Sequence, residues 1–210
     1  MKNNLFIIAQ NGWRVIGLSF ASFLFFYLLD FDFLATLAFF FTLFLLFIYR
    51  NPERQIATHD AKSILAPVDG IVKKIESLED SEYAYMIEVE SSYSDVGILR
   101  VPADAKVIEA SLTKGSRLAK YSPLFEKLNE SAYVVFQNAE GKKIAITHRL
   151  KRSIVPLDID LHKDEQIASS ARYGYMMDGV SYIYLESDVR ISVTVGQKLE
   201  AAQTLFAYSS

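Results

Sequence analysis

Cysteine is absent from this 210-residue chain, and histidine occurs only three times, at His59, His148 and His162. The lack of cysteine excludes disulfide bonds, thiolate nucleophiles and cysteine-ligated metals, and it is typical of proteins in a reducing compartment. The three histidines do not have the spacing of a metal-ligand set. The sequence therefore predicts no metal cofactor.

Basic residues are not in excess. The chain has 22 Lys and Arg against 25 Asp and Glu, and residues 51–210 alone hold 19 basic and 23 acidic side chains. A nucleic-acid-binding domain presents a basic patch or stripe. The charge balance therefore excludes nucleic acid as a partner.

Charge is scarcest in the first 50 residues, where two long apolar runs stand. Residues 13–29 contain Arg14 as their only charge, and residues 33–49 contain none. Because the second run is apolar around the whole helix circumference, the sequence predicts a membrane hairpin, residues 1–50, rather than a hairpin in water. Each run rises about 25 Å as a helix, less than the roughly 30 Å hydrocarbon core. Two arrangements stay open: a transmembrane hairpin with local thinning of the bilayer, and a re-entrant hairpin that enters from one face.

The flanking charges predict the orientation of this hairpin. Basic residues stand near its two ends and only acidic residues at its tip: Lys2, Arg14, Arg50 and Arg54 against Asp30 and Asp32. The positive-inside rule then places both ends, and the rest of the chain, in the cytoplasm. We expect a protein of the bacterial inner (cytoplasmic) membrane whose partner is membrane phospholipid.

The remaining sequence predicts a linker, residues 51–63, followed by a mainly β domain, residues 64–210. Short apolar or alternating runs bounded by turn-forming residues predict strands; they are residues 71–72, 86–89, 133–136, 144–146, 182–185 and 191–195. Only residues 118–130 have a helical pattern. A faint repeat relates residues 67–72 (PVDGIV) to 102–107 (PADAKV), which favours a sandwich or barrel of repeated hairpins.

Six short segments carry a resemblance to a known family. They are residues 8–13 (IAQNGW), 49–54 (YRNPER), 64–70 (ILAPVDG), 127–130 (KLNE), 172–174 (RYG) and 193–207 (VTVGQKLEAAQTLFA). In this order they resemble the short, membrane-anchored class of phosphatidylserine decarboxylases and the related archaetidylserine decarboxylases. The resemblance implies a β-rich domain on a membrane anchor and a proenzyme that cuts itself at a Gly–Ser bond. The Ser becomes a pyruvoyl group that decarboxylates phosphatidylserine to phosphatidylethanolamine, and an Asp and a His assist the cleavage.

Two of the catalytic positions implied by this resemblance are altered. Asp69 stands where the family has its Asp, although Pro-Val-Asp-Gly also suits a plain turn. Gly97 stands where the family has His, and Val180 follows Gly179 where the family has the cleaved Ser. Glycine cannot take a proton, and valine has no hydroxyl for the attack or the elimination. We therefore expect a degenerate site without a pyruvoyl cofactor.

Ser181, one residue later, is the alternative source of a pyruvoyl group. A shift of one residue turns a strand side chain to the opposite face of the sheet, so we expect Ser181 to point away from Asp69. With Ser181 processed, the chain is an active decarboxylase. Without processing, it is a membrane protein of the family with a lipid- or partner-binding role.

A basic cluster, His148, Arg149, Lys151 and Arg152, is the candidate headgroup-binding site. Each cation near an anionic membrane adds about 1 kcal/mol of attraction. The alternative is a solvated strand edge whose charge is offset by acidic residues nearby. Beyond phospholipid, the partners considered are a second copy of the chain and an active decarboxylase.

Overall fold

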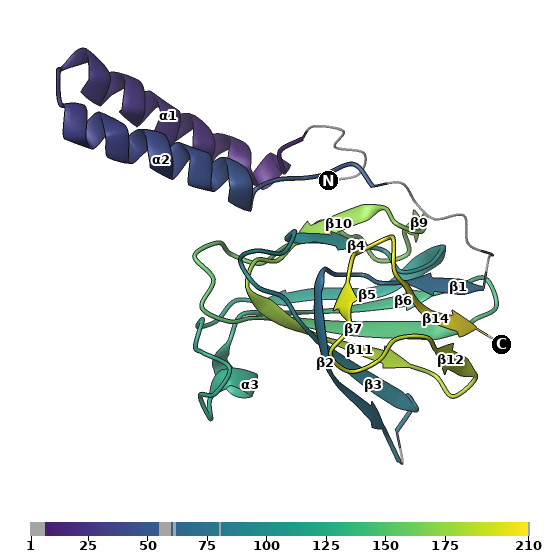
Figure 1. Cartoon of the computed structure of the whole chain (residues 1–210). Helices are drawn as coiled ribbons and strands as arrows, with labels where there is room; N and C mark the ends of the chain where they lie inside the picture. Colours follow the sequence, from purple (N-terminus) through teal and green to yellow (C-terminus); the bar gives the residue numbers. More distant parts are fainter. Residues whose placement is uncertain (1–6, 55–59, 61, 80, 210) are drawn as a thin grey trace. The chain divides into compact units, whose positions relative to one another are not determined.

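The computed structural model describes residues 7–54, 60, 62–79 and 81–209 (Figure 1). The chain divides into two compact units, with the boundary between Glu53 and Arg54. The first unit is helical and the second is rich in β structure. Part of the predicted linker, residues 55–59 and 61, lies outside the described residues.

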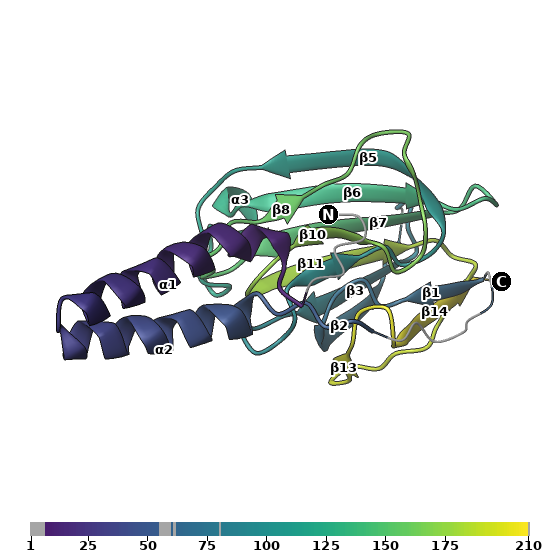
Figure 2. The ribbon, with the colours of Figure 1, turned by 90° about the horizontal axis from the view of Figure 1, so that it is seen from above.

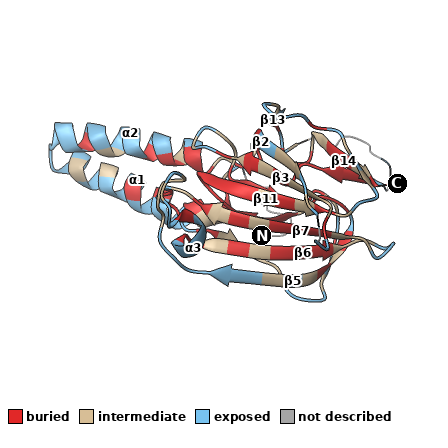
Figure 3. Ribbon diagram, turned by 90° about the horizontal axis from the view of Figure 1, so that it is seen from below, coloured by how far each residue is buried: buried red, intermediate tan, exposed pale blue. Residues whose placement is uncertain are grey.

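The helical unit is a hairpin of two helices, α1 (Trp13–Leu28) and α2 (Asp32–Ile48), preceded by the short 3-10 helix η1 (Gln10–Gly12). The helices run side by side in opposite directions (Figures 1 and 2). Between them the hydroxyls of Ser19 and Thr42 lie 2.7 Å apart in a hydrogen bond. Most other side chains are apolar and exposed; Figure 3 colours the exposed residues of both helices pale blue.

The expected hairpin of two helices is confirmed. The helices have 16 and 17 residues, a rise of about 24–26 Å. Within the described part of the chain, no helix has both the length and the apolarity needed to cross a membrane.

The second unit confirms the prediction of a mainly β, antiparallel fold. Among the described residues its strands are β1 (Ser63–Leu65), β2 (Gly70–Ser77), β3 (Tyr85–Glu90), β4 (Ile98–Arg100), β5 (Ala105–Thr113), β6 (Ser131–Gln137), β7 (Lys143–Leu150), β8 (Asp158–Ile159), β9 (Gln166–Ile167), β10 (Arg172–Tyr175), β11 (Gly179–Leu185), β12 (Val189–Ile191), β13 (Lys198–Leu199) and β14 (Leu205–Ser209). Five of the six predicted runs lie inside strands. Of the sixth, residues 191–195, only Ile191 belongs to one, β12.

These strands form one large sheet and two small ones. The large sheet has the order β13-β2-β3-β11-β7-β6-β5-β9, and the small ones have the orders β1-β14-β12 and β4-β10-β8. All three sheets contribute to one apolar core, for example through Ile183 of β11, Tyr173 of β10 and Phe206 of β14. Because strand side chains alternate, Ile183 and Leu185 of β11 face this core while Tyr182 and Tyr184 face the other side of the sheet.

The helix expected over residues 118–130 is wrong for most of its length. Only α3 (Phe125–Leu128) is helical. Pro123 disfavours helical geometry at Ser122, the residue before it. The side chain of Asn129 also fixes a loop, since it accepts a hydrogen bond from the Leu118 N–H and donates one to the Leu118 carbonyl.

Candidate functional site

Three loops of the β unit meet where the catalytic residues are expected. Asp69 directly precedes β2, Gly97 precedes β4, and Gly179 begins β11. Ser91 joins two of them, because its hydroxyl donates to the Asp69 carbonyl and its N–H donates to the Gly179 carbonyl at 2.9 Å. The Met176 N–H donates to the Gly97 carbonyl at 2.7 Å. The fold therefore brings the three positions into one neighbourhood.

Asp69 already has a full set of hydrogen-bond donors. The guanidinium of Arg54 binds both carboxylate oxygens at 2.6 Å, and the side chains are only 9% and 7% exposed. The Ala201 N–H donates to Oδ1 at 2.8 Å, and the Val96 N–H lies 3.4 Å from Oδ2. Asp69 is thus the anionic half of a buried ion pair that joins the start of the β unit to two other loops.

Gly97 has no room for a larger side chain. A Cβ atom at this position would lie 2.8 Å from Cζ of Tyr175 and 3.0 Å from the Met176 carbonyl oxygen. Both distances are shorter than ordinary carbon contacts. The Tyr175 ring, fully buried, therefore fills the space beside this position.

Val180 is fully buried and points to the side of the large sheet opposite the core. It is paired with Glu90 of β3 and Arg149 of β7, so the three side chains share this face. Lys151 binds Glu90 at 2.7 Å and Asp178 at 3.2 Å. Burial alone would raise the pKa of Glu90, but Lys151 and Lys120 outweigh it and lower that pKa. A hydrocarbon side chain therefore stands among paired charges.

Ser181 faces the core, on the opposite side of β11 from Val180. Its hydroxyl lies 2.8 Å from Nδ1 of His148, the residue directly opposite on β7. Nε2 of His148 lies 2.6 Å from the hydroxyl of Tyr173. All three residues have no exposed surface. Burial lowers the pKa of His148 to about 3 and raises that of Tyr173 above its ordinary value, so both are neutral at pH 7.

The candidate headgroup-binding cluster is divided between two faces. The prediction that His148 binds a headgroup is wrong, because His148 is fully buried on the core face of β7, the face that also carries Ile144 and Ile146. Arg149 pairs with Glu126 at 3.0 Å, and Lys151 pairs with Glu90 and Asp178. Of the four, only Arg152 is an exposed cation.

Comparison with known proteins settles the family. The model of the phosphatidylserine decarboxylase family matches residues 41–207. The chain belongs to this family. A phosphatidylserine decarboxylase proenzyme of Syntrophotalea carbinolica is 30% identical over 216 residues, with 99% of each chain covered. The proenzyme of Neorickettsia sennetsu is 29% identical over 78% of this chain and 76% of the relative. That of Geobacter metallireducens is 30% identical over 78% and 77%.

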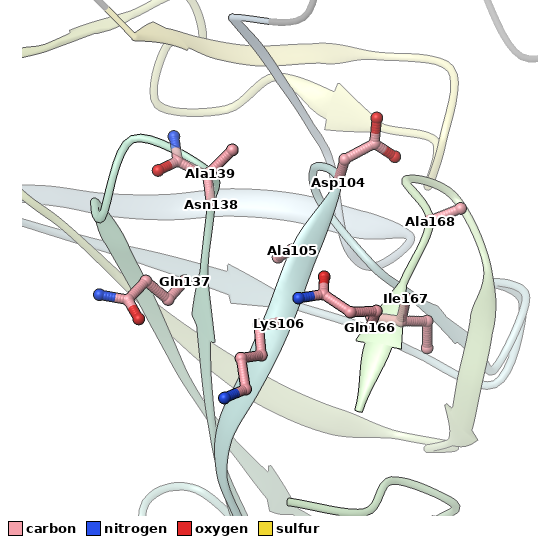
Figure 4. A pocket seen from close by; sticks show the side chains of 9 residues that line it. All are labelled: Asp104, Ala105, Lys106, Gln137, Asn138, Ala139, Gln166, Ile167 and Ala168. Atoms are coloured by element: carbon pink, nitrogen blue, oxygen red, sulfur yellow. The ribbon is translucent and has the colours of Figure 1, made fainter. Parts of the chain in front are cut away.

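The phosphatidylserine decarboxylase fold also holds a cavity away from these residues. It measures about 430 Å³ and lies between β5, β9 and the turn after β6 (Figure 4). Its charged side chains have partners, since Lys106 pairs with Asp164 at 2.6 Å and Asp104 accepts from the Ser169 N–H at 2.7 Å. None of the residues predicted for the site lines it. In the described ranges, no group of three or more acidic or histidine side chains is arranged to hold a metal ion.

The buried His148 gives a first prediction, an acid-sensitive stability. Its pKa is about 3 in the folded chain and about 6.5 in an unfolded one. Between these values the unfolded chain binds a proton that the folded chain does not. The contribution of neutral His148 to the free energy of unfolding should therefore be fully present above pH 6.5. Below that pH the free energy of unfolding should fall by about 1.4 kcal/mol per pH unit. Urea unfolding at pH 7 and pH 5 measures this loss.

The matched control for this prediction is His148→Gln, which keeps a polar side chain but does not titrate. The variant should show a loss between pH 7 and pH 5 that is smaller by about 2 kcal/mol. Equal losses in the two proteins would mean that His148 takes up no proton on unfolding.

Proposed function

We propose that this chain is an unprocessed phosphatidylserine decarboxylase relative that lacks pyruvoyl catalysis and acts as a lipid- or partner-binding protein in phospholipid metabolism. Val180, directly after Gly179 at the start of β11, carries the proposal. Self-processing needs a hydroxyl oxygen to attack the preceding carbonyl, and the resulting ester must then eliminate. Valine offers no oxygen, so neither step can take place at this position.

Two further contacts support the loss of self-processing. Tyr175 fills the space beside Gly97, so the place of the family's histidine side chain is occupied by a tyrosine ring. Both carboxylate oxygens of Asp69 accept hydrogen bonds from the Arg54 guanidinium, and Oδ1 also accepts one from a backbone N–H group. An Asp in a self-processing triad instead orients a histidine.

We propose that the helical hairpin holds the protein at the membrane as a re-entrant hairpin. Its outward side chains form a continuous apolar surface of a kind that marks membrane-contact sites; those at least 45% exposed include Leu18, Phe20, Phe25, Phe33, Leu37, Phe40, Leu43, Phe44 and Phe47. The basic flanks favour the cytoplasmic face of a bacterial inner membrane. Phospholipid is then the first partner, and a second copy of the chain or an active decarboxylase is the next.

One observation favours a second candidate function, decarboxylation through Ser181. The Ser181 hydroxyl lies 2.8 Å from a neutral imidazole nitrogen, the arrangement that activates a nucleophilic serine. In this reaction Oγ attacks the Val180 carbonyl and the Val180–Ser181 amide bond breaks to an ester. Elimination then releases the Val180 carboxylate and leaves a dehydroalanine, which water hydrolyses to a pyruvoyl group and ammonia. However, Ser181 faces the core with no exposed surface. Substrate would have to enter the core to reach it.

Intact mass separates the two functions. Protein extracted from membranes with detergent should give one chain of 23.8 kDa that does not react with hydrazine or borohydride, and Ser181→Ala should look the same apart from the substitution. The second candidate instead requires two fragments, residues 1–180 and 181–210, with the smaller one blocked to Edman degradation. It also requires that Ser181→Ala abolish the cleavage.

A further inference from the structure

One end of the β unit exposes large apolar side chains that its fold does not use. Tyr121, Leu124 and Leu128, in and beside α3, are 87%, 47% and 48% exposed, and Ile154, in the loop after β7, is 59% exposed. Together with the nearby cations Lys127 and Arg152, these residues are termed the loop-end surface. Figures 1 and 2 show α3 at one end of the large sheet.

The loop-end surface is held in place by hydrogen bonds. The Arg117 guanidinium donates to the Ser153 carbonyl at 3.1 Å, which joins the loop around α3 to the loop that carries Ile154. Asn129, only 2% exposed, donates to the carbonyls of Leu118 and Leu150. The apolar side chains therefore project from a fixed frame, so that their exposure is a built feature of the unit.

Two exposed cations of this surface stand out from the rest. Residues 114–128 contain four Lys or Arg and a single Glu, but three of these cations pair with acidic residues outside that range: Lys114 and Arg117 with the buried Glu130, and Lys120 with Glu88 and Glu90. Lys127 and Arg152 form no ion pair with any residue that the structure describes. Exposed aromatic and aliphatic side chains beside lysine and arginine are the composition that binds an anionic lipid surface, where each cation adds about 1 kcal/mol.

Chain connectivity also favours a lipid surface over a protein partner. Five residues lead from Tyr49, which follows α2, to Arg54, which is bound to Asp69 in the β unit. Extended, they reach at most about 18 Å. A hairpin in the bilayer therefore keeps the β unit within reach of the bilayer surface.

We infer that the β unit docks onto anionic phospholipid through the loop-end surface, as a second membrane contact beside the hairpin. The inference rests on the proposed membrane location of the hairpin and not on the loss of catalysis. The loop of Ile154 follows Leu150, the residue paired with Gly179. Docking therefore turns the end of the sheet that carries Val180 toward the lipid headgroups.

The absence of cysteine allows a direct test on the full chain. Single cysteines replace Leu124 or Leu128 and carry an environment-sensitive fluorophore, and the matched control replaces Val195, an apolar residue 61% exposed in the loop between β12 and β13. The proteins are reconstituted into phosphatidylcholine vesicles with and without phosphatidylglycerol. Labels at 124 and 128 should shift to the blue and be quenched by nitroxide lipids several-fold more than the label at 195. Lys127→Glu with Arg152→Glu should remove most of this difference.

Two outcomes would overturn the inference. Equal quenching at positions 124, 128 and 195 would place the loop-end surface in water. A blue shift without quenching by nitroxide lipids would mean that a second copy of the chain covers it. In both cases the hairpin still anchors the protein, and the intact mass of the same preparation reports on processing separately.

Discussion

Asp69→Asn is expected to lower the free energy of unfolding of the β unit by about 3–5 kcal/mol, the usual cost of removing one member of a buried ion pair. The variant leaves the Arg54 guanidinium 9% exposed with a neutral amide in place of its carboxylate. It also turns one acceptor oxygen into a donor beside the N–H groups of Ala201 or Val96. Urea unfolding followed by tyrosine fluorescence measures the change, since the single tryptophan, Trp13, lies in α1.

The repeat in the sequence supplies a matched control, Asp104→Asn. Asp104 precedes β5 as Asp69 precedes β2, but it is exposed and its side chain accepts one backbone hydrogen bond, from the Ser169 N–H. An asparagine keeps that acceptor, so the change should stay within about 0.5 kcal/mol. Asp69→Asn combined with Arg54→Met should cost less than the sum of the single variants, because the second change removes the unpaired charge. A stable Asp69→Asn protein would contradict the role assigned to the pair.

The role of Asp69 shows where local sequence reasoning ends. Its surroundings in the sequence, Pro-Val-Asp-Gly, allowed a catalytic Asp or a turn residue. The structure adds a third role, that of acceptor for Arg54, 15 positions earlier, and for Ala201, 132 positions later. Neither contact can be predicted from the residues around Asp69, because both depend on how the fold brings distant loops together.

The parts of the fold that could be predicted are those with a regular period. The alternation of apolar residues placed β3, β6, β7 and β11, and the two long apolar runs placed α1 and α2. The same alternation contained a signal for the buried histidine: Ile144, Ile146, His148 and Leu150 are spaced by two, which puts His148 on the core face of β7. The neighbouring Arg149 and Lys151 favoured a surface interpretation instead, and that interpretation was wrong for His148.

The candidate site was predictable in its positions but not in its packing. The order of the motifs identified Gly97 and Val180, and the structure brings their loops together. The contact of Tyr175 with Gly97 could not be predicted, because it depends on the register between β4 and β10, where Ile98 pairs with Tyr175. That register follows from side-chain packing across strands more than 70 residues apart in the sequence.

Gly97→His, the change that restores the family's residue, is expected to destabilise the chain by about 3 kcal/mol, the upper end for overpacking a filled core. The reason is the Tyr175 ring, 2.8 Å from the place of the new Cβ. Unfolding in urea measures this cost. Gly17→His is the control: this glycine in α1 has no atom within 4 Å of an added Cβ, so it tests for an effect of histidine itself.

Shortening the tyrosine should relieve that collision. Tyr175→Ala alone should cost about 3–5 kcal/mol, because it empties a fully buried site. The double variant Gly97→His, Tyr175→Ala should be more stable than the sum of the two losses by about 1–3 kcal/mol, since each change removes the other's defect. Additive losses would show that Tyr175 does not occupy the place of the missing histidine side chain. A coupling of the expected sign would show that one tyrosine closes the space in which the base of a phosphatidylserine decarboxylase would have to stand.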